Sequence, residues 1–374
     1  MKVCFITPEL PPYLTGGIGV ATLNLAKVLA KRGHDITIIT RQLKSKKIFE
    51  KIGKIKIYRL KCTKLRFLAL SHFIFIIKTI LLIKTRKINC EVYYAQAILS
   101  QGFTSAILNK YFNKKTVVHI RGIDFIRRHN KQFKALSSFV LKNNTLVFTL
   151  SKDHQKVLTK EVGRKIHYLT NGKELSFKKS QKECKSELKF GKQLHITYVG
   201  RLDTVKGLIY AIKAIENIPN TLLHIIGEES SGSTVETERL KKYVKDHKIE
   251  NKVIFHGVLN RNKVFTFIKA SDIFIHPLLI AAGMGNAVLE AMYLKTVIIG
   301  TNIGYFKELI SDNKTGLLVK KSDANDLRKA IIKLGNVKKR RTLEKNAFNK
   351  IVKDHSWENI AKKFEKVMKD EFNI

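Results

Sequence analysis

The sequence predicts an α/β protein built from two doubly wound parallel-sheet domains. Strand-like apolar runs alternate with helix-length segments in both halves of the chain. The chain has 374 residues, which is more than one hydrophobic core usually supports. Hydrophobic residues make up 44% of it and prolines number only 5, so we expect two ordinary globular cores without long disordered linkers.

The first half opens with a strand, a glycine-rich turn, a helix and a second strand. KVCFIT (2–7) has the pattern of a buried strand, residues 20–33 have helical periodicity that stops at Gly33, and HDITIIT (34–40) is the next strand. This βαβ unit predicts a parallel sheet with right-handed crossovers. The remaining strand-like runs of this half are KIKIYRL (54–60), EVYYAQ (91–96), TVVHIRG (116–122) and TLVFTLS (145–151).

A polar, lysine-rich stretch without periodicity, residues 173–193, is predicted to connect the two domains. We place the first domain at 1–175 and the second at 190–355. The second domain repeats the alternation, with helices expected from Gly207 and near 237–247, 260–270 and 286–293. Its strand-like runs are LHITYVGRL (194–202), TLLHIIGEE (221–229), KVIFHGVL (252–259), DIFIHPLL (272–279), TVIIGTNIG (296–304) and TGLLVK (315–320).

Residues 356–374 form an amphipathic segment that begins with a capping Ser356. We expect a final helix here, long enough to cross back to the first domain. Ligands of doubly wound sheets bind at the carboxyl ends of the strands. With two such domains facing each other, the cleft between them is the expected site.

Charge is the unusual feature of the composition, because 71 Lys and Arg against 30 Asp and Glu give a net charge of +41. Compositional drift is one interpretation, and attraction to nucleic acid, acidic lipid or phosphorylated substrates is the other. Residues 41–90 hold 15 Lys and Arg but one acid, Glu50, together with the apolar run 67–83. This combination favours an anionic membrane surface over a specific nucleic-acid groove.

The apolar run is not expected to span a membrane, since His72 and Lys78 interrupt it and it is shorter than the ~20 residues that a span needs. A helix packed in a domain core is the alternative interpretation. The amino terminus has the pattern of a strand rather than a signal peptide. The four cysteines show neither metal nor disulfide spacing. We therefore expect a cytoplasmic protein that is peripheral on the inner membrane face.

Two motifs are candidates for binding phosphate. Residues 15–19 (TGGIG) lie between the first strand and the first helix, where glycine amides can approach an anion, although a generic tight turn explains them equally well. Arg201 and Lys206 follow a strand of the second domain and are five residues apart. Both can converge on one diphosphate, Arg201 as a fork and Lys206 as a point charge.

Two further motifs carry polar side chains beside glycines. In residues 280–292 (IAAGMGNAVLEAM), Gly283 and Gly285 can shape a loop and Asn286 can cap the helix that bears Glu290. Glu290 can accept hydrogen bonds from a ribose diol or can be an ordinary helix glutamate. His119, Arg121 and Asp124 cluster after a first-domain strand, where His119 and Asp124 suit acid–base or positioning roles; a lone loop histidine is usually inert.

The chain resembles the retaining GT-B glycosyltransferases of family 4 (glycosyl transferases group 1). The resemblance is carried by residues 6–40, TNGKE (170–174), residues 198–215, GMGNAVLEAM (283–292) and DNKTGLLVK (312–320). It implies two Rossmann-like domains, the first for an acceptor and the second for a nucleotide-sugar such as a UDP- or GDP-sugar. Lipid-linked glycans, lipopolysaccharide and capsular polysaccharide are the acceptors that it implies.

The resemblance also implies roles for individual residues. Arg201 and Lys206 would hold the donor diphosphate, Glu290 the ribose, and the base would lie near Gly257 and Val258. The remaining donor-binding positions would be Gly16, Gly17, Arg121, Gly283, Met284, Gly285, Asn286 and Val288. Catalysis would need neither a protein nucleophile nor a divalent metal, because the cations and helix ends supply the positive field.

Three positions depart from the family pattern. Ala282 stands where the family often has a glutamate that contacts the transferred sugar, eight residues before Glu290. Arg121 replaces a histidine, and Lys173-Glu174 replace the end of an NG-x-Asp motif. Because of Ala282, a nucleotide-sugar-binding protein that has lost transfer is the alternative hypothesis.

Overall fold

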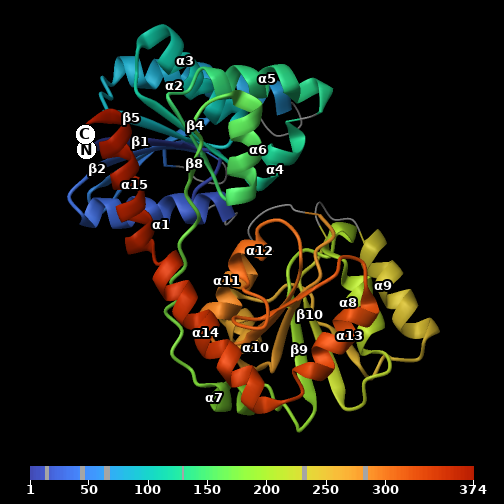
Figure 1. Cartoon of the computed structure of the whole chain (residues 1–374). Helices are drawn as coiled ribbons and strands as arrows, with labels where there is room; N and C mark the ends of the chain where they lie inside the picture. Colours follow the sequence, from blue (N-terminus) through green and yellow to red (C-terminus); the bar gives the residue numbers. More distant parts are fainter. Residues whose placement is uncertain (13–16, 43–46, 63–67, 129, 230–233, 281–284) are drawn as a thin grey trace. The chain divides into compact units, whose positions relative to one another are not determined.

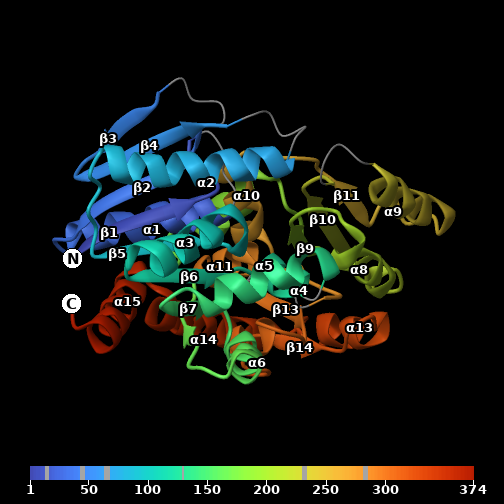
Figure 2. The ribbon, with the colours of Figure 1, turned by 90° about the horizontal axis from the view of Figure 1, so that it is seen from above.

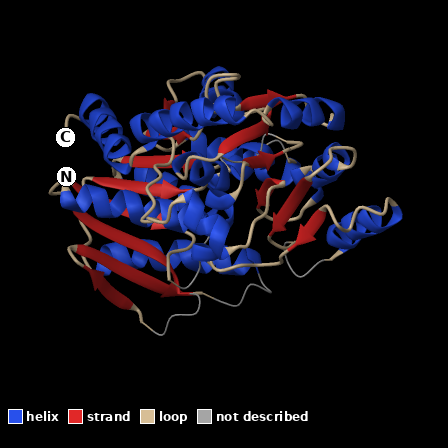
Figure 3. Cartoon of the chain, turned by 90° about the horizontal axis from the view of Figure 1, so that it is seen from below, coloured by secondary structure: helices blue, strands red, loops and turns tan. Residues whose placement is uncertain are grey.

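The computed structural model describes residues 1–12, 17–42, 47–62, 68–128, 130–229, 234–280 and 285–374. The chain divides into two compact units, one made of residues 1–172 with 355–374 and the other of residues 173–354 (Figure 1). Each unit contains its own sheet, flanked by helices (Figure 3). The prediction of a doubly wound α/β fold in both halves is therefore confirmed.

The first unit has an eight-stranded sheet in the order β3-β4-β2-β1-β5-β6-β7-β8. Its neighbours pair in parallel except β3 with β4. The sequence did not predict β3 and β8, which are too short to show a period of two. The strands are β1 Lys2–Thr7, β2 Asp35–Gln42, β3 Phe49–Ile52, β4 Ile55–Lys61, β5 Val92–Gln96, β6 Thr116–Ile120, β7 Leu146–Thr149 and β8 His167–Tyr168.

Helices cover both faces of this sheet (Figure 1). On one face α1 and α15 pack through a core that includes Tyr94, Phe148 and Phe364. On the other face Phe75 and Tyr93 pack in a core with residues of α2 and α3, and Figure 2 shows α2 along β4. The helical segments are α1 Gly17–Lys31, α2 Leu68–Thr85, η2 Ile98–Gly102, α3 Phe103–Phe112, α4 Gly122–Arg127, α5 Lys131–Lys142, α6 Lys152–Val162 and α15 Trp357–Phe372.

The second unit has a six-stranded parallel sheet in the order β11-β10-β9-β12-β13-β14. Helices α8 and α13 pack together on one face, and α10 and α11 cover the other. The strands are β9 Leu194–Val199, β10 Thr221–Ile226, β11 Val253–Phe255, β12 Ile273–His276, β13 Val297–Thr301 and β14 Leu317–Val319. The helical segments are α7 Gln181–Glu187, η3 Thr204–Lys206, α8 Leu208–Ile215, α9 Val235–Asp246, α10 Arg261–Ala270, α11 Asn286–Tyr293, α12 Phe306–Leu309, α13 Ala324–Lys333 and α14 Val337–His355.

Each sheet has a switch point, where the chain turns from one side of the sheet to the other. In the first sheet β1 lies between β2 and β5, and in the second β9 lies between β10 and β12. Loops that follow such strands border the crevice in which doubly wound sheets bind ligands. The glycine-rich turn follows β1, while Arg201 and Lys206 follow β9. The topology therefore places both predicted phosphate motifs at switch points.

The structure differs from the prediction in the stretch between the domains. Residues 173–193 contain α7, which packs against α10 in the second unit. Ser180 Oγ accepts from the Glu183 amide, and the Glu183 carboxylate accepts from the Ser180 amide. A seven-residue helix is too short to produce a recognisable periodicity, which is why only its capping box could have predicted it.

The chain returns to the first unit through α15, as predicted. Ser356 caps this helix by accepting a hydrogen bond from the Asn359 amide. The ring of Trp357 lies against Gly172, where a Cβ would come within 2.4 Å of the indole. The glycine that ends the first part of the unit is therefore required for the docking of its last helix.

Candidate active site

Arg201 and Lys206 lie together after β9, as their spacing predicts. The Tyr198 hydroxyl donates to the Arg201 carbonyl oxygen at 2.7 Å and so fixes the start of the loop. The exposed Arg201 guanidinium lies 3.2 Å from an Asp203 carboxylate oxygen. Lys206 is half-buried, and its ammonium has no hydrogen-bond or ion-pair partner among the described residues. Burial lowers the pKa of Lys206 and the neighbouring Arg201 lowers it further, whereas Asp203 raises it. An anion bound here would favour the charged form of Lys206 more strongly.

The loop after β9 is tied to the loop after β12. Leu279 donates its amide to the Val205 carbonyl oxygen at 2.9 Å. Gly207 has a φ of 67°, and a Cβ at this position would lie 2.1 Å from the Pro277 carbonyl oxygen. Only glycine fits this close approach. These contacts therefore fix the loop that carries the two cations against the segment that leads to α11.

His276, at the end of β12, lies near Lys206. Its ring stacks on Tyr198 with centroids 5.4 Å apart, and its Nδ1 is buried without a hydrogen-bond partner among the described residues. Burial lowers its pKa to about 3, with a smaller contribution from the Lys206 charge. His276 is therefore neutral and adds no charge to the site. The sequence analysis did not single it out.

Glu290 is buried in α11 and paired with two cations. Its Oε1 accepts hydrogen bonds from Lys173 Nζ at 2.5 Å and Arg261 Nη2 at 2.8 Å, whereas Oε2 accepts none from the described residues. Burial lowers the pKa of Lys173, and Glu290 partly offsets that effect. Sequence reasoning found the carboxylate but missed both cations, which are distant from it along the chain.

The loop before α11 is only partly described, because Ala282, Gly283 and Met284 lie outside the described residues. The expectation that Asn286 caps the helix is wrong. Gly285 occupies the N-cap position with φ of 59°, and Asn286 is the first helical residue. Glycine is favoured there because the left-handed conformation is costly for other residues.

Valines 288 and 258, both predicted to contact the donor, differ in their surroundings. Val288 is fully buried in the core of the second unit. Val258 is 63% exposed and follows Gly257, which has a φ of 63° with open space around its Cα. Val258 is therefore better placed than Val288 to contact a ligand.

Glycines end three neighbouring strands of the second sheet, and only Gly257 was singled out from the sequence. Gly200 follows β9 and Gly227 follows β10, and a Cβ on Gly227 would lie 1.9 Å from the Gly200 carbonyl oxygen. The Gly227 amide donates to the Gly257 carbonyl oxygen at 2.8 Å. The backbones of the three glycines therefore lie close together, and no side chain projects from these positions. A glycine ending each of three successive strand-like runs was the signal available in the sequence.

In the first unit, α1 begins at Gly17, three residues before the predicted start. Gly16 lies outside the described residues, and Gly17 is exposed. The Gly19 amide donates to Glu9 Oε1 at 3.3 Å, and a Cβ on Gly19 would lie 2.8 Å from the Glu9 carbonyl oxygen. One amide at this helix end therefore already has a carboxylate partner within the chain.

His119, Arg121 and Asp124 are all buried at the end of β6, with partners within the protein. The His119 Nδ1 atom is hydrogen-bonded to the Tyr94 hydroxyl at 2.7 Å, and burial holds the pKa of His119 well below its usual range. Asp124 accepts the Arg121 amide at 3.0 Å and so caps α4. These contacts favour structural roles for His119 and Asp124 over the predicted catalytic ones. Strand alternation could not show that the imidazole lies in a core.

The Arg121 guanidinium is hydrogen-bonded to two neutral side chains. Its Nη1 donates to Asn171 Oδ1 at 3.1 Å and its Nη2 to the Gln96 side-chain oxygen. Burial lowers the pKa of Arg121, with opposing contributions from Tyr94 and Asp124. The predicted donor contact of Arg121 remains a prediction.

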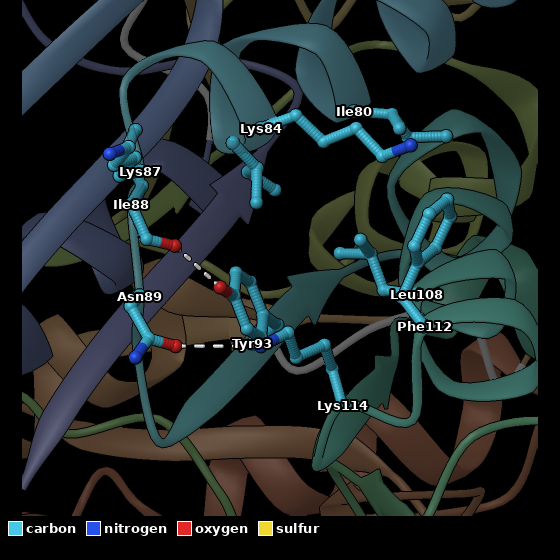
Figure 4. A pocket seen from close by; sticks show the side chains of 10 residues that line it. Ile80, Lys84, Lys87, Ile88, Asn89, Tyr93, Leu108, Phe112 and Lys114 are labelled. Atoms are coloured by element: carbon cyan, nitrogen blue, oxygen red, sulfur yellow. Dashed lines mark hydrogen bonds between the residues drawn. The ribbon is translucent and has the colours of Figure 1, made fainter.

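Two cavities open at the other edge of the sheets, near the amino ends of the strands. One has a volume of about 300 Å³ and is lined in part by Ile83, Tyr93, Leu108 and Lys114 (Figure 4). The second, of about 720 Å³, lies in the second unit and includes Asp272 in its lining. Neither contains a predicted site residue.

Comparison with known proteins matches both halves of the chain. Residues 15–177 match the model of Glycosyltransferase Family 4, and residues 179–350 match that of Glycosyl transferases group 1. The chain is 28% identical over 271 residues to the UDP-Gal:alpha-D-GlcNAc-diphosphoundecaprenol alpha-1,3-galactosyltransferase of Escherichia coli, covering 67% of each chain.

Solved structures resemble the whole chain. Sucrose-phosphate synthase from Thermosynechococcus elongatus aligns with a TM-score of 0.86 and 20% identity, covering 100% of this chain and 99% of the other. HepE of Anabaena, in complex with UDP and glucose, aligns with a TM-score of 0.80 and 16% identity, covering 99% of this chain and 100% of the other. At these identities the likeness establishes the GT-B fold.

Proposed function

The chain belongs to the glycosyltransferases of family 4 and group 1, and we propose that it transfers a hexose-type sugar from a nucleotide-sugar to a glycan acceptor with retention of configuration. The observation that carries this proposal is the pair Arg201 and Lys206 at the switch point of the second sheet. Lys206 is half-buried and forms no ion pair with the described residues, because the nearby Asp203 pairs with Arg201. A donor diphosphate would provide an anionic partner.

The chemistry that we propose is displacement of a nucleoside diphosphate by an acceptor hydroxyl on the same face of the sugar. The bond from the anomeric carbon to the phosphate oxygen breaks as the new glycosidic bond forms. The leaving phosphate takes the hydroxyl proton, so no protein nucleophile takes part. Arg201 and Lys206 stabilise the charge on the leaving group, and the proposal requires no divalent metal.

We place the nucleoside across the strand ends of the second unit. Glu290 Oε2 accepts no hydrogen bond from the described residues and is therefore available to the ribose hydroxyls. Gly257 and the exposed Val258 offer an open edge for the base. UDP and GDP are both compatible with this placement, and the UDP complex of HepE supports testing UDP-sugars first.

We assign the acceptor to the first unit and to the class of lipid-linked, lipopolysaccharide or capsular glycans. The Escherichia coli relative is named for a GlcNAc-diphosphoundecaprenol acceptor, and a 24% identical relative from Salmonella typhimurium is a lipopolysaccharide 1,2-N-acetylglucosaminetransferase. Acceptors of this kind are held at membranes. A location in the cytoplasm on the inner membrane face follows from the proposal.

Helix α2 supports the membrane contact that we propose. Leu70, Phe73, Ile77 and Leu81 are exposed along it at helical spacing. Lys78 and Lys84 lie in the carboxyl-terminal half of the helix, and Arg86 and Lys87 follow its end. None of the helices in the described parts of the chain has the length and hydropathy of a membrane span. The stripe therefore suits adsorption to an anionic bilayer surface.

Sedimentation with vesicles tests the membrane contact. Phe73→Glu with Ile77→Glu should abolish binding to phosphatidylglycerol vesicles. Ile332→Glu, at an exposed apolar position of α13 in the second unit, is the matched control and should leave it unchanged. Equal sedimentation of the double variant and the wild type would show that α2 is not the contact.

A screen of nucleotide-sugars tests the transfer itself. Thermal shift and mass spectrometry with UDP-, GDP- and ADP-sugars should identify one donor that stabilises the protein and is slowly hydrolysed. The alternative, a nucleotide-sugar-binding protein without transfer, is favoured by Ala282, which stands where the family often has glutamate. Donor binding with neither hydrolysis nor transfer, and activity gained by Ala282→Glu, would support that alternative.

A further inference from the structure

Arg41 lies at the carboxyl edge of the first sheet in a cluster of neutral side chains. Its Nη2 lies 2.7 Å from His72 Nδ1 of α2 and 3.2 Å from Ser100 Oγ of η2. His72 Nδ1 and Ser100 Oγ are themselves 3.0 Å apart. The guanidinium carbon lies 5.5 Å from the centre of the Phe75 ring. Three segments that are far apart in the sequence therefore meet around one half-buried arginine.

No carboxylate among the described residues compensates the charge of Arg41. Burial lowers the pKa of His72 to about 4, with a further contribution from Arg41, so the imidazole is neutral. Burial also lowers the pKa of Arg41 itself. On the neighbouring strand, Arg59 is hydrogen-bonded to Glu50 Oε1 at 3.0 and 2.5 Å. Arg41 and Arg59 thus differ in whether the protein supplies the anion.

Hydrogen-bond donors are left over at the same edge. The Nε atoms of Arg41 and Arg121 and the Nε2 atom of Gln101 are buried and have no partner among the described residues. Arg41 is the second-last residue of β2. Gln101 lies in η2, the helical turn after β5, and Arg121 directly follows β6. Buried donors without partners are costly, and an anion bound at Arg41 would supply an acceptor for its Nε atom.

We propose that Arg41 and Ser100 bind a phosphate group of the acceptor, which makes the acceptor a phosphate-linked glycan. This inference rests on the proposed function, which places the acceptor in the first unit. A guanidinium fork with a hydroxyl beside it suits the oxygens of a phosphate group. The Escherichia coli relative, named for a diphosphate-linked acceptor, is consistent with this class.

Calorimetric titration of isopentenyl diphosphate, a soluble prenyl diphosphate without a sugar, tests the site. The protein is first saturated with the nucleoside diphosphate found in the donor screen, so that Arg201 and Lys206 are occupied. The wild type should bind the probe, Arg41→Gln should weaken binding at least tenfold, and Arg41→Lys should be intermediate because it keeps the charge but loses the fork. Lys56→Gln, which removes an exposed cation of β4, should have no effect.

Several outcomes would overturn the assignment. Equal affinities of the wild type and Arg41→Gln would do so, as would an absence of binding to the nucleotide-saturated protein. Binding of glucuronate but not of the diphosphate would point to a carboxylate-bearing acceptor instead. Thermal unfolding of each variant shows whether Arg41→Gln is folded, and Arg41→Lys preserves the test if it is not.

Failure of the proposed function would look different. If no nucleoside diphosphate binds, the titration is repeated on Arg201→Gln with Lys206→Gln, in which only the Arg41 site remains. In an active enzyme, Arg41→Gln should raise KM for a phosphate-linked acceptor at least tenfold with little change in kcat. It should leave hydrolysis of the donor in the absence of acceptor unchanged.

Discussion

Buried charges at the carboxyl edges of the two sheets are paired in different ways. In the second unit Glu290 accepts hydrogen bonds from Lys173 and Arg261, both on one oxygen. In the first unit the guanidinium groups of Arg41 and Arg121 are hydrogen-bonded to neutral side chains.

The difference shows that a high net charge does not by itself locate a binding site. Most of the +41 charge lies on exposed side chains, where a cation costs little. The informative cations are those that are desolvated without an ion-paired carboxylate. Their desolvation costs free energy that no paired charge within the protein offsets. By this criterion Arg41 is the candidate in the first unit. In the second unit it is Lys206, which forms no ion pair with the described residues although Asp203 raises its pKa.

The largest effect is expected at Lys206. Lys206→Gln should lower transfer by about 100-fold, because removal of one donor to the leaving group typically costs that much. Steady-state transfer with the identified donor measures it. Lys213→Gln removes an exposed cation of α8 and should be without effect. Transfer by Lys206→Gln at the wild-type rate would show that desolvation does not mark the functional cation.

The next effect compares the stability cost of removing a paired charge, Glu290, with that of removing an unpaired one, Arg41. Glu290→Gln leaves the buried Lys173 without its carboxylate and should lower the free energy of unfolding by about 3 kcal/mol. Arg41→Gln removes a cation that has no carboxylate, so its cost should be below about 1 kcal/mol. Urea unfolding measures both. The double variant Lys173→Met with Glu290→Gln should recover most of the loss, and equal costs of the two single variants would contradict the contrast.

The alternation of strands and helices could be predicted because it is local. Each strand carries its own apolar pattern, and β9 to β14 all lie where the sequence places them. The position of Arg201 and Lys206 after β9 could be predicted for the same reason. α7 could not be recognised by periodicity, because seven residues give fewer than two repeats.

The interactions that define the candidate site could not be predicted, because they join distant parts of the chain. Lys173 and Glu290 are 117 positions apart, and Arg41 meets Ser100 over 59 positions. His119 shows the converse case. Its place at a strand end suggested chemistry, but its partner Tyr94 lies on the adjacent strand and makes it a core residue.

A smaller effect concerns the backbone of the second edge. Gly227 has a φ of 134°, and Gly227→Ala would also place a Cβ 1.9 Å from the Gly200 carbonyl oxygen, so strain and clash together should cost about 2 kcal/mol of stability. Gly257→Ala meets nothing within 4 Å but has a φ of 63°, so its cost should be about 1 kcal/mol. Thermal unfolding of the pair measures the difference. Equal destabilisation would show that the close approach of the strand ends relaxes readily.

The smallest effect is the loss of stability of the second unit at low pH. His195, His224 and His256 form a row across neighbouring strands, with nitrogen distances of 3.1 Å at both steps. Burial lowers the pKa of His224 to about 3, so the unfolded chain takes up the proton first. The stability due to this group is complete above about pH 6.5 and falls as the pH drops towards 3, by about 1 kcal/mol between pH 6.5 and 5.5.

His224→Gln keeps a hydrogen-bonding group in the middle of the row but removes its titration. The variant should therefore lose about 1 kcal/mol less than the wild type over that pH interval in urea unfolding. The same acid slope in His224→Gln and the wild type would mean that His224 does not contribute to the acid response.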